Sequence, residues 1–114
     1  MPGPQVHPPP TRSPLTIDSR YDADTVTLVL RGEIDLASAP ALERKLEDAE
    51  SLLPRRIVLD LAGLDFIDSA GIHLLIDAQQ RAQADGHQLI LTHVPAHATR
   101  LFRLTGINER LVVE

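Results

Sequence analysis

One short segment brings together the side chains most capable of chemistry. Asp68 and Ser69 follow an apolar pair, and Ala70-Gly71 come directly after them. This order is typical of a chain that leaves a strand and begins a helix, where a carboxylate accepts free backbone N–H groups and complements the helix dipole. A hydroxyl at the same place can carry a phosphate, because the helix N-terminus offers backbone donors to an anion. The segment therefore supports two interpretations, a helix cap alone or a phosphoacceptor at Ser69.

Other chemistries have weaker support. Ser69 and His73 have helical spacing, but the sequence lacks the Gly-x-Ser-x-Gly turn and the second oxyanion donor of a serine hydrolase. His93 and His97 have the spacing of a helical metal pair, yet Pro95 lies between them and interrupts the helix. The sequence contains neither the Gly-x-Gly-x-x-Gly motif of dinucleotide-binding proteins nor the Gly-x-x-x-x-Gly-Lys-Ser/Thr motif of phosphate-binding loops. We therefore expect no catalytic residue, no metal and no cofactor.

Composition excludes several further classes of function. The 114 residues suit one domain, and 43% of them are hydrophobic, enough for a packed core. A net charge of −5 with two Phe, one Tyr and no Trp is unsuited to direct nucleic-acid binding. The absence of cysteine removes disulfides and thiol chemistry. Because no apolar run exceeds three residues and no secretory signal is recognisable, we expect a cytoplasmic protein without a membrane span.

The chain divides into a proline-rich start and a regular remainder. Residues 1–14 hold six of the nine prolines, so we expect a disordered tail there and a folded domain over residues 15–114. The expected elements of the domain are strands at 15–17 and 26–30, a helix from the N-cap Ser38 to about Leu53, a strand at 57–61, a helix at 69–85 that stops at Gly86, a strand at 88–92, a helix at 96–104 and a short strand at 111–113.

This succession predicts an α/β fold. The first two strands are close enough for an antiparallel hairpin, and the later strand–helix–strand units predict parallel pairs joined by right-handed crossovers. The result is a single domain with a mixed β-sheet of about four to five strands and about three helices packed on it.

Two motifs in combination resemble one protein family. The residues RGEID at 31–35 and FIDSAGI at 66–72, with IVLDL at 57–61 between them, look like a STAS domain. More narrowly, the chain resembles the bacterial anti-sigma-factor antagonists over residues 15–113. The segment from Pro95 to Gly106 also resembles the third helix of that family.

The resemblance implies a regulated binding protein and not an enzyme. In the family, the serine after the aspartate is phosphorylated by a partner serine kinase of the histidine-kinase-like ATPase type, which is also the anti-sigma factor. Unphosphorylated antagonist binds this kinase and frees a sigma factor for transcription, and a PP2C-type phosphatase reverses the modification. The resemblance makes Ser69 the phosphoacceptor, and the partner-binding residues are Glu33, Asp35, Asp68, Ser69, Ala70, Gly71 and His73.

The chain departs from the family pattern in three places. Ala70 stands where many members have a second hydroxyl residue, and His73 replaces a small residue. The sequence also ends near the position of the family's last helix, so we expect that helix to be absent or short. Two alternatives stay open: a STAS accessory subunit of a lipid-transport ABC system, or another STAS module that binds without phosphorylation. A nucleotide-binding protein is a third class, which no phosphate loop supports.

Overall fold

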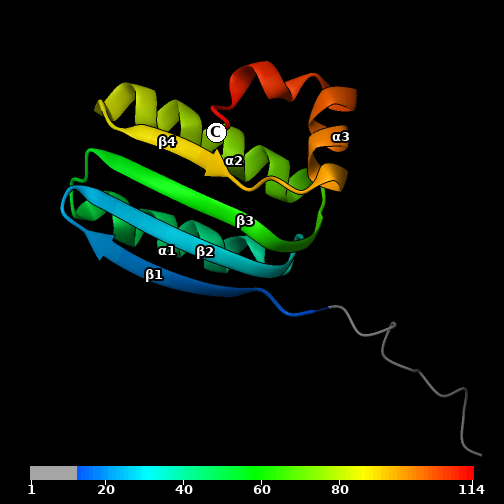
Figure 1. Cartoon of the computed structure of the whole chain (residues 1–114), viewed down its shortest axis with the longest axis horizontal. Coiled ribbons are helices and arrows are strands. Elements are labelled where there is room, and N and C mark those ends of the chain that lie inside the picture. The colour runs from blue at the N-terminus through cyan, green and yellow to red at the C-terminus, as the bar shows by residue number, and fades with distance from the viewer. Residues whose placement is uncertain (1–12) are drawn as a thin grey trace, which may run out of the picture.

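The computed structural model describes residues 13–114. The expected disordered tail therefore lies outside the described residues, apart from Ser13 and Pro14. The described chain forms four strands, three α-helices and one 3₁₀ turn (Figure 1). Their bounds are β1 (Thr16–Asp22), β2 (Thr25–Ile34), α1 (Ala39–Ser51), β3 (Arg56–Ile67), α2 (Ser69–Asp85), β4 (Gln88–Thr92), α3 (Ala96–Thr105) and η1 (Ile107–Arg110).

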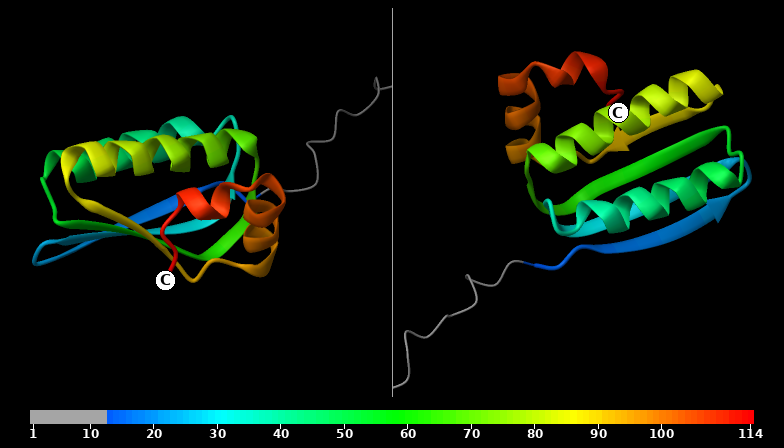
Figure 2. Two further views of the ribbon diagram at one scale, coloured as in Figure 1. Left: turned by 90° about the horizontal axis from the view of Figure 1, so that it is seen from above. Right: turned by 180° about the vertical axis from the view of Figure 1, so that it is seen from behind.

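The sheet has the order β1-β2-β3-β4. β1 and β2 form the predicted antiparallel hairpin, and β3 runs parallel to both β2 and β4. From β2 to β4, each strand lies next to the one before it, and α1 and α2 connect them. When successive right-handed crossovers move across a sheet in one direction, their helices lie on the same face. Figure 2 shows α1 and α2 side by side over one face, with α3 at the end of the sheet. The predicted α/β fold is confirmed.

One predicted element is wrong. Residues 111–113 do not form a strand, because only Val113 pairs with β4, in a single parallel bridge to Leu91. The Leu91 N–H donates to the Val112 carbonyl at 2.9 Å, and the Glu114 N–H donates to the Leu91 carbonyl at 2.9 Å. The preceding residues are used by η1, and the side chain of Leu111 is buried in the core, so too few residues remain to extend the pairing.

The core lies between the sheet and the two long helices. Alternate residues of the inner strands point to this face, as the two-residue period of a strand requires. The fully buried side chains that fill it include Leu28, Leu30, Leu42, Leu46, Ile57, Leu59, Leu61, Leu75, Leu89 and Leu91. This layer holds α1 and α2 firmly over the sheet.

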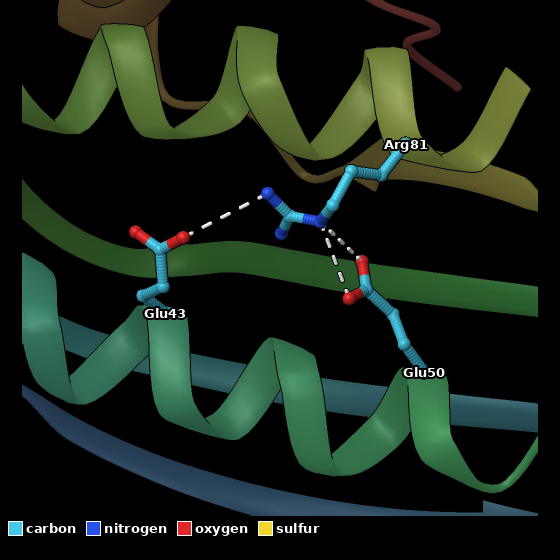
Figure 3. Close-up of polar contacts among 3 residues, drawn as sticks. All are labelled: Glu43, Glu50 and Arg81. Atoms are coloured by element: carbon cyan, nitrogen blue, oxygen red, sulfur yellow. Dashed lines mark hydrogen bonds and ion pairs between the residues drawn. The ribbon is translucent and has the colours of Figure 1, made fainter. Parts of the chain in front are cut away.

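A polar contact joins the two helices above this core. Arg81 of α2 reaches across to α1, where its Nε lies 3.1 and 3.3 Å from the two carboxylate oxygens of Glu50 (Figure 3). Its Nη1 lies 3.7 Å from the carboxylate of Glu43, which is about two turns earlier than Glu50 on α1. The side chains of Arg81 and Glu50 are both largely shielded from water, so this ion pair is screened less than an exposed one. It fixes how the helices lie alongside one another.

The start of the described chain is attached to the end of β2. The Glu33 N–H donates to the Ser13 carbonyl at 3.2 Å, and the Ser13 N–H donates to the Glu33 carboxylate at 3.1 Å. Gly32 makes this approach possible, because its φ of +100° is unsuited to other residues and a Cβ there would overlap the Pro14 carbonyl.

We expect Gly32→Ala to destabilise the fold more than Gly86→Ala does. Both glycines have positive φ, but a Cβ at Gly86 meets nothing within 4 Å. Gly86→Ala should therefore cost about 1–2 kcal/mol, the backbone penalty alone. Gly32→Ala should cost roughly 1–3 kcal/mol more, because residues 13 and 14 must move. Urea unfolding of both variants measures the difference, and equal losses would show that residues 13 and 14 are not held.

Candidate functional site

The predicted site residues meet at one edge of the sheet. β2 and β3 are parallel, so their carboxyl ends lie at the same edge, with Ile34 opposite Ile67. Asp35 and Asp68 each follow directly after these residues. The two chain segments are joined there, because the Asp68 N–H donates to the Ile34 carbonyl at 3.1 Å.

Asp68 begins helix α2. Its backbone is extended, and its Oδ1 accepts hydrogen bonds from the N–H groups of Ala70 at 2.9 Å and Gly71 at 3.2 Å. These are two of the free donors at a helix start, so the predicted capping role is confirmed by geometry. Ser69 is then the first helical residue, and its side chain is exposed. Within residues 13–114, the Ser69 hydroxyl makes no hydrogen bond.

Gly71 allows the first turn of α2 to pack directly on the sheet. A Cβ at this position would lie 2.7 Å from Ile34 Cγ2 and 2.7 Å from Ile67 Cγ1, closer than real side chains approach. Both isoleucines are buried and held by the strands, so neither can give way easily. The glycine therefore sets how near Ser69 lies to the ends of β2 and β3.

The turn between β2 and α1 has a cap of its own. The Asp35 carboxylate accepts from the Ser38 N–H at 2.9 Å, and the Ser38 hydroxyl accepts from the Asp35 N–H at 2.9 Å. The Ser38 hydroxyl also donates to the Glu33 carbonyl at 2.9 Å. Ser38 is the N-cap residue of α1, as predicted, but its hydroxyl does not cap the helix. The Ser38 side chain turns back to the residues before it, and its reciprocal bonds with Asp35 hold the turn that leads into α1.

The predicted partner-binding residues all belong to this edge or the first turns beside it. Glu33, Asp35 and Asp68 are half-buried, and His73 is exposed on α2 one turn after Ser69. Their carboxylates make the edge acidic.

The fold agrees with that of known proteins. Residues 11–114 match the family described as "Mlab, STAS domain". The chain belongs to the STAS domain family. It is 37% identical over 78 residues to BtrV of Bordetella bronchiseptica, a candidate anti-sigma factor antagonist by its name, covering 68% of this chain and 66% of BtrV. It is 28% identical to the anti-sigma-B factor antagonist of Bacillus subtilis over 96 residues, covering 83% of this chain and 86% of that one.

The arrangement of helices and strands is also similar to that of a solved structure. An anti-sigma factor antagonist from Mycobacterium paratuberculosis superposes with a TM-score of 0.77 at 24% identity, covering 87% of this chain and 84% of that chain. This likeness establishes the STAS fold of the chain. None of the helices formed by residues 13–114 is long and apolar enough to cross a membrane.

Two apolar side chains on the site edge of this STAS domain were missed by the sequence reasoning. Leu36 follows Asp35 in the β2–α1 turn and is 78% exposed, and Phe66 at the end of β3 is 39% exposed. One feature of the sequence could have indicated that Leu36 is exposed: it does not fall on the apolar, buried face of α1. These side chains add exposed apolar atoms to the acidic edge.

The histidines considered for a metal pair have separate contacts. His93 Nδ1 lies 3.2 Å from the Asp60 carboxylate, and His97 Nε2 donates to the Leu64 carbonyl at 2.8 Å. The second bond ties the start of α3 to β3 just before the site. In the part of the chain that the structure describes, no three His, Cys, Asp or Glu side chains are placed to hold a metal ion.

We expect Asp68→Ala to lower the free energy of unfolding by about 1 kcal/mol, because two N–H groups at the start of α2 lose their acceptor. Asp68→Asn is the matched control, since its amide oxygen can accept the same bonds. It should lose only a few tenths of a kcal/mol from the missing charge. Thermal or urea unfolding of both variants decides the point, and equal losses for Ala and Asn would contradict the capping role.

Proposed function

We propose that this STAS domain is an anti-sigma-factor antagonist whose binding to an anti-sigma-factor serine kinase is controlled by phosphorylation of Ser69. The observation that carries the proposal is the exposed hydroxyl at the first residue of α2, which has no hydrogen bond within residues 13–114 and lies on an edge shared by Glu33, Asp35 and Asp68. Relatives named as anti-sigma-B factor antagonists support the same function. Its place of action is the cytoplasm, where ATP and sigma factors are found.

The geometry is suited to accepting a phosphate without unfolding. A kinase of the ATPase type transfers the γ-phosphoryl group of ATP to Ser69 Oγ, so that ADP and the hydroxyl proton are released. The new dianion lies at the positive end of the helix dipole of α2, which stabilises an exposed anion by about 0.3–1 kcal/mol. Asp68 remains hydrogen bonded to the backbone, so the cap does not need to rearrange.

The same phosphate opposes binding. It adds about −1.5 to −2 charges to an edge that already carries Glu33, Asp35 and Asp68. A partner that covers the exposed Leu36 nearby must also remove water from this charge. Where the partner offers no compensating cation, that desolvation costs a few kcal/mol, and each 1.4 kcal/mol lowers affinity tenfold.

The proposal assigns the chemistry to the partners and not to this chain. Ser69 and His73 lie on the same helix. Among the described residues, however, no hydrogen bond joins their side chains, so His73 does not activate the Ser69 hydroxyl. The kinase therefore supplies the phosphoryl group, and a PP2C-type phosphatase hydrolyses the Ser69 phosphoester to restore the binding form. A STAS subunit of a lipid-transport ABC system is the alternative, and it requires no phosphate at Ser69.

We expect incubation with the cognate kinase and ATP to add one phosphoryl group to the protein, measured by intact mass. Ser69→Ala should take up none and should bind the kinase persistently in titrations with ATP present. Ser69→Glu should bind at least several-fold more weakly than Ser69→Ala, although one carboxylate imitates a dianion incompletely.

Ser51→Ala is the matched control, because Ser51 is an exposed serine at the end of α1, away from the Ser69 edge. It should be phosphorylated as the unchanged protein is. Backbone amide shifts of the phosphorylated protein should change near residues 33–36 and 65–73 only. Phosphate on another residue, undiminished kinase binding, or shifts throughout the sheet would refute the proposed switch.

A further inference from the structure

Strand β1 lies at the edge of the sheet and carries an unusual arrangement of side chains. Among residues 13–114, its outer side pairs with no strand (Figure 1). Tyr21 at the far end of β1 is 63% exposed, and Asp18 and Arg20 are exposed as well. Exposed edges of this length invite pairing with another chain unless charges prevent it.

The pairing with β2 fixes which face each side chain occupies. Ile17 lies opposite Leu30 and Tyr21 lies opposite Val26, both core residues, so these two side chains point to the helix-covered face. Asp18 and Arg20 alternate with them and point to the opposite face. Ser19 lies at the centre of the seven residues of β1.

We propose that two copies of this chain pair through β1, antiparallel, with Ser19 opposite Ser19 of the second copy. This register places Asp18 of each copy opposite Arg20 of the other, which makes two cross-strand charge pairs on one face. It also places Ile17 of each copy opposite Tyr21 of the other on the helix-covered face. Directly opposite residues of an antiparallel pair point to the same face and interact, so both sets are favourable.

The charges select this register over its neighbours. Shifting the centre to Asp18 places two aspartates opposite each other. Shifting it to Arg20 places two arginines opposite each other and Asp18 opposite Asp22. Like charges directly opposite are destabilising. The centre at Ser19 pairs opposite charges and uses every residue of β1, so the edge is complementary to itself.

A groove beside β1 has room for the aromatic ring. It has a volume of about 430 Å³ and lies between β1 and α1, with Leu15, Ile17 and Ala41 as its apolar lining. Charged residues of α1, including Lys45 and Glu47, form its rim. In the Ser19 register, Tyr21 of the second copy lies over Ile17, where the ring covers the apolar lining and the hydroxyl reaches the charged rim.

The paired form leaves the Ser69 edges free. A twofold axis perpendicular to the sheet reverses the strand direction, so the carboxyl ends of β2 in the two copies point opposite ways. The product is a continuous eight-stranded sheet that ends in β4 on both sides, and the two Ser69 residues lie at opposite edges of it, each at the carboxyl end of its own β3. Self-association is therefore compatible with binding at Ser69 and does not depend on that function.

Sedimentation equilibrium of the full chain over a concentration series tests the pairing. We expect a monomer–dimer equilibrium in the micromolar range, because one strand edge makes a small interface. Arg20→Asp and Asp18→Arg should each raise the dissociation constant of the homodimer about tenfold or more. Mixing these two variants should restore association as a heterodimer, because opposite charges again face each other. Tyr21→Ser should also weaken the homodimer.

Arg103→Asp is the matched control, because it reverses an exposed arginine on α3, away from β1. It should dimerise as the unchanged chain does. Asp18→Arg also removes a contact to Arg31 at 3.0 Å, but that pair is exposed and contributes little to folding, which circular dichroism can verify. A chain that stays monomeric up to about 1 mM, a dimer indifferent to both charge reversals, or a mixture that fails to associate would overturn the proposal.

Discussion

The backbone N–H of Asp68 donates to the Ile34 carbonyl while its carboxylate accepts from Ala70 and Gly71. One residue thus joins the end of β2, the end of β3 and the start of α2. The position of Ser69 depends on this junction, because the residue that follows a fixed helix cap has little freedom. The hydroxyl is exposed on a rigid support, so a modification there changes the surface and leaves the support in place.

The rest of the molecule serves to hold that junction. The buried leucines and isoleucines between the sheet and the long helices fix α2 over β3, and Arg81 ties α2 to Glu50 of α1. His97 adds a bond from α3 to Leu64 of β3, beyond the point where pairing with β4 stops at Asp60. The carboxyl half of β3 is therefore held by α3 on one side and by β2 on the other.

The parts of the fold with strong local signals could be predicted from the sequence. The start of α2 at Ser69 and its end before Gly86 follow from a cap at each terminus, and the hairpin and crossovers follow from strand spacing. The position of Ser38 at the N-cap of α1 could be predicted, but the partner of its hydroxyl could not, because that hydroxyl turns back to the Glu33 carbonyl at the end of β2. The exposure of Leu36 and the single bridge at Val113 likewise depend on how distant segments pack.

The close approach at Gly71 separates two kinds of position within one helical turn. Gly71 faces Ile34 and Ile67 and has no space for a side chain, so substitution there is limited by packing. Ala70 is half-buried and His73 is exposed, so their side chains can vary without moving the helix. If this edge binds the partner as proposed, duplicated copies of such a domain can diverge in partner choice at these two positions while the fold stays constant.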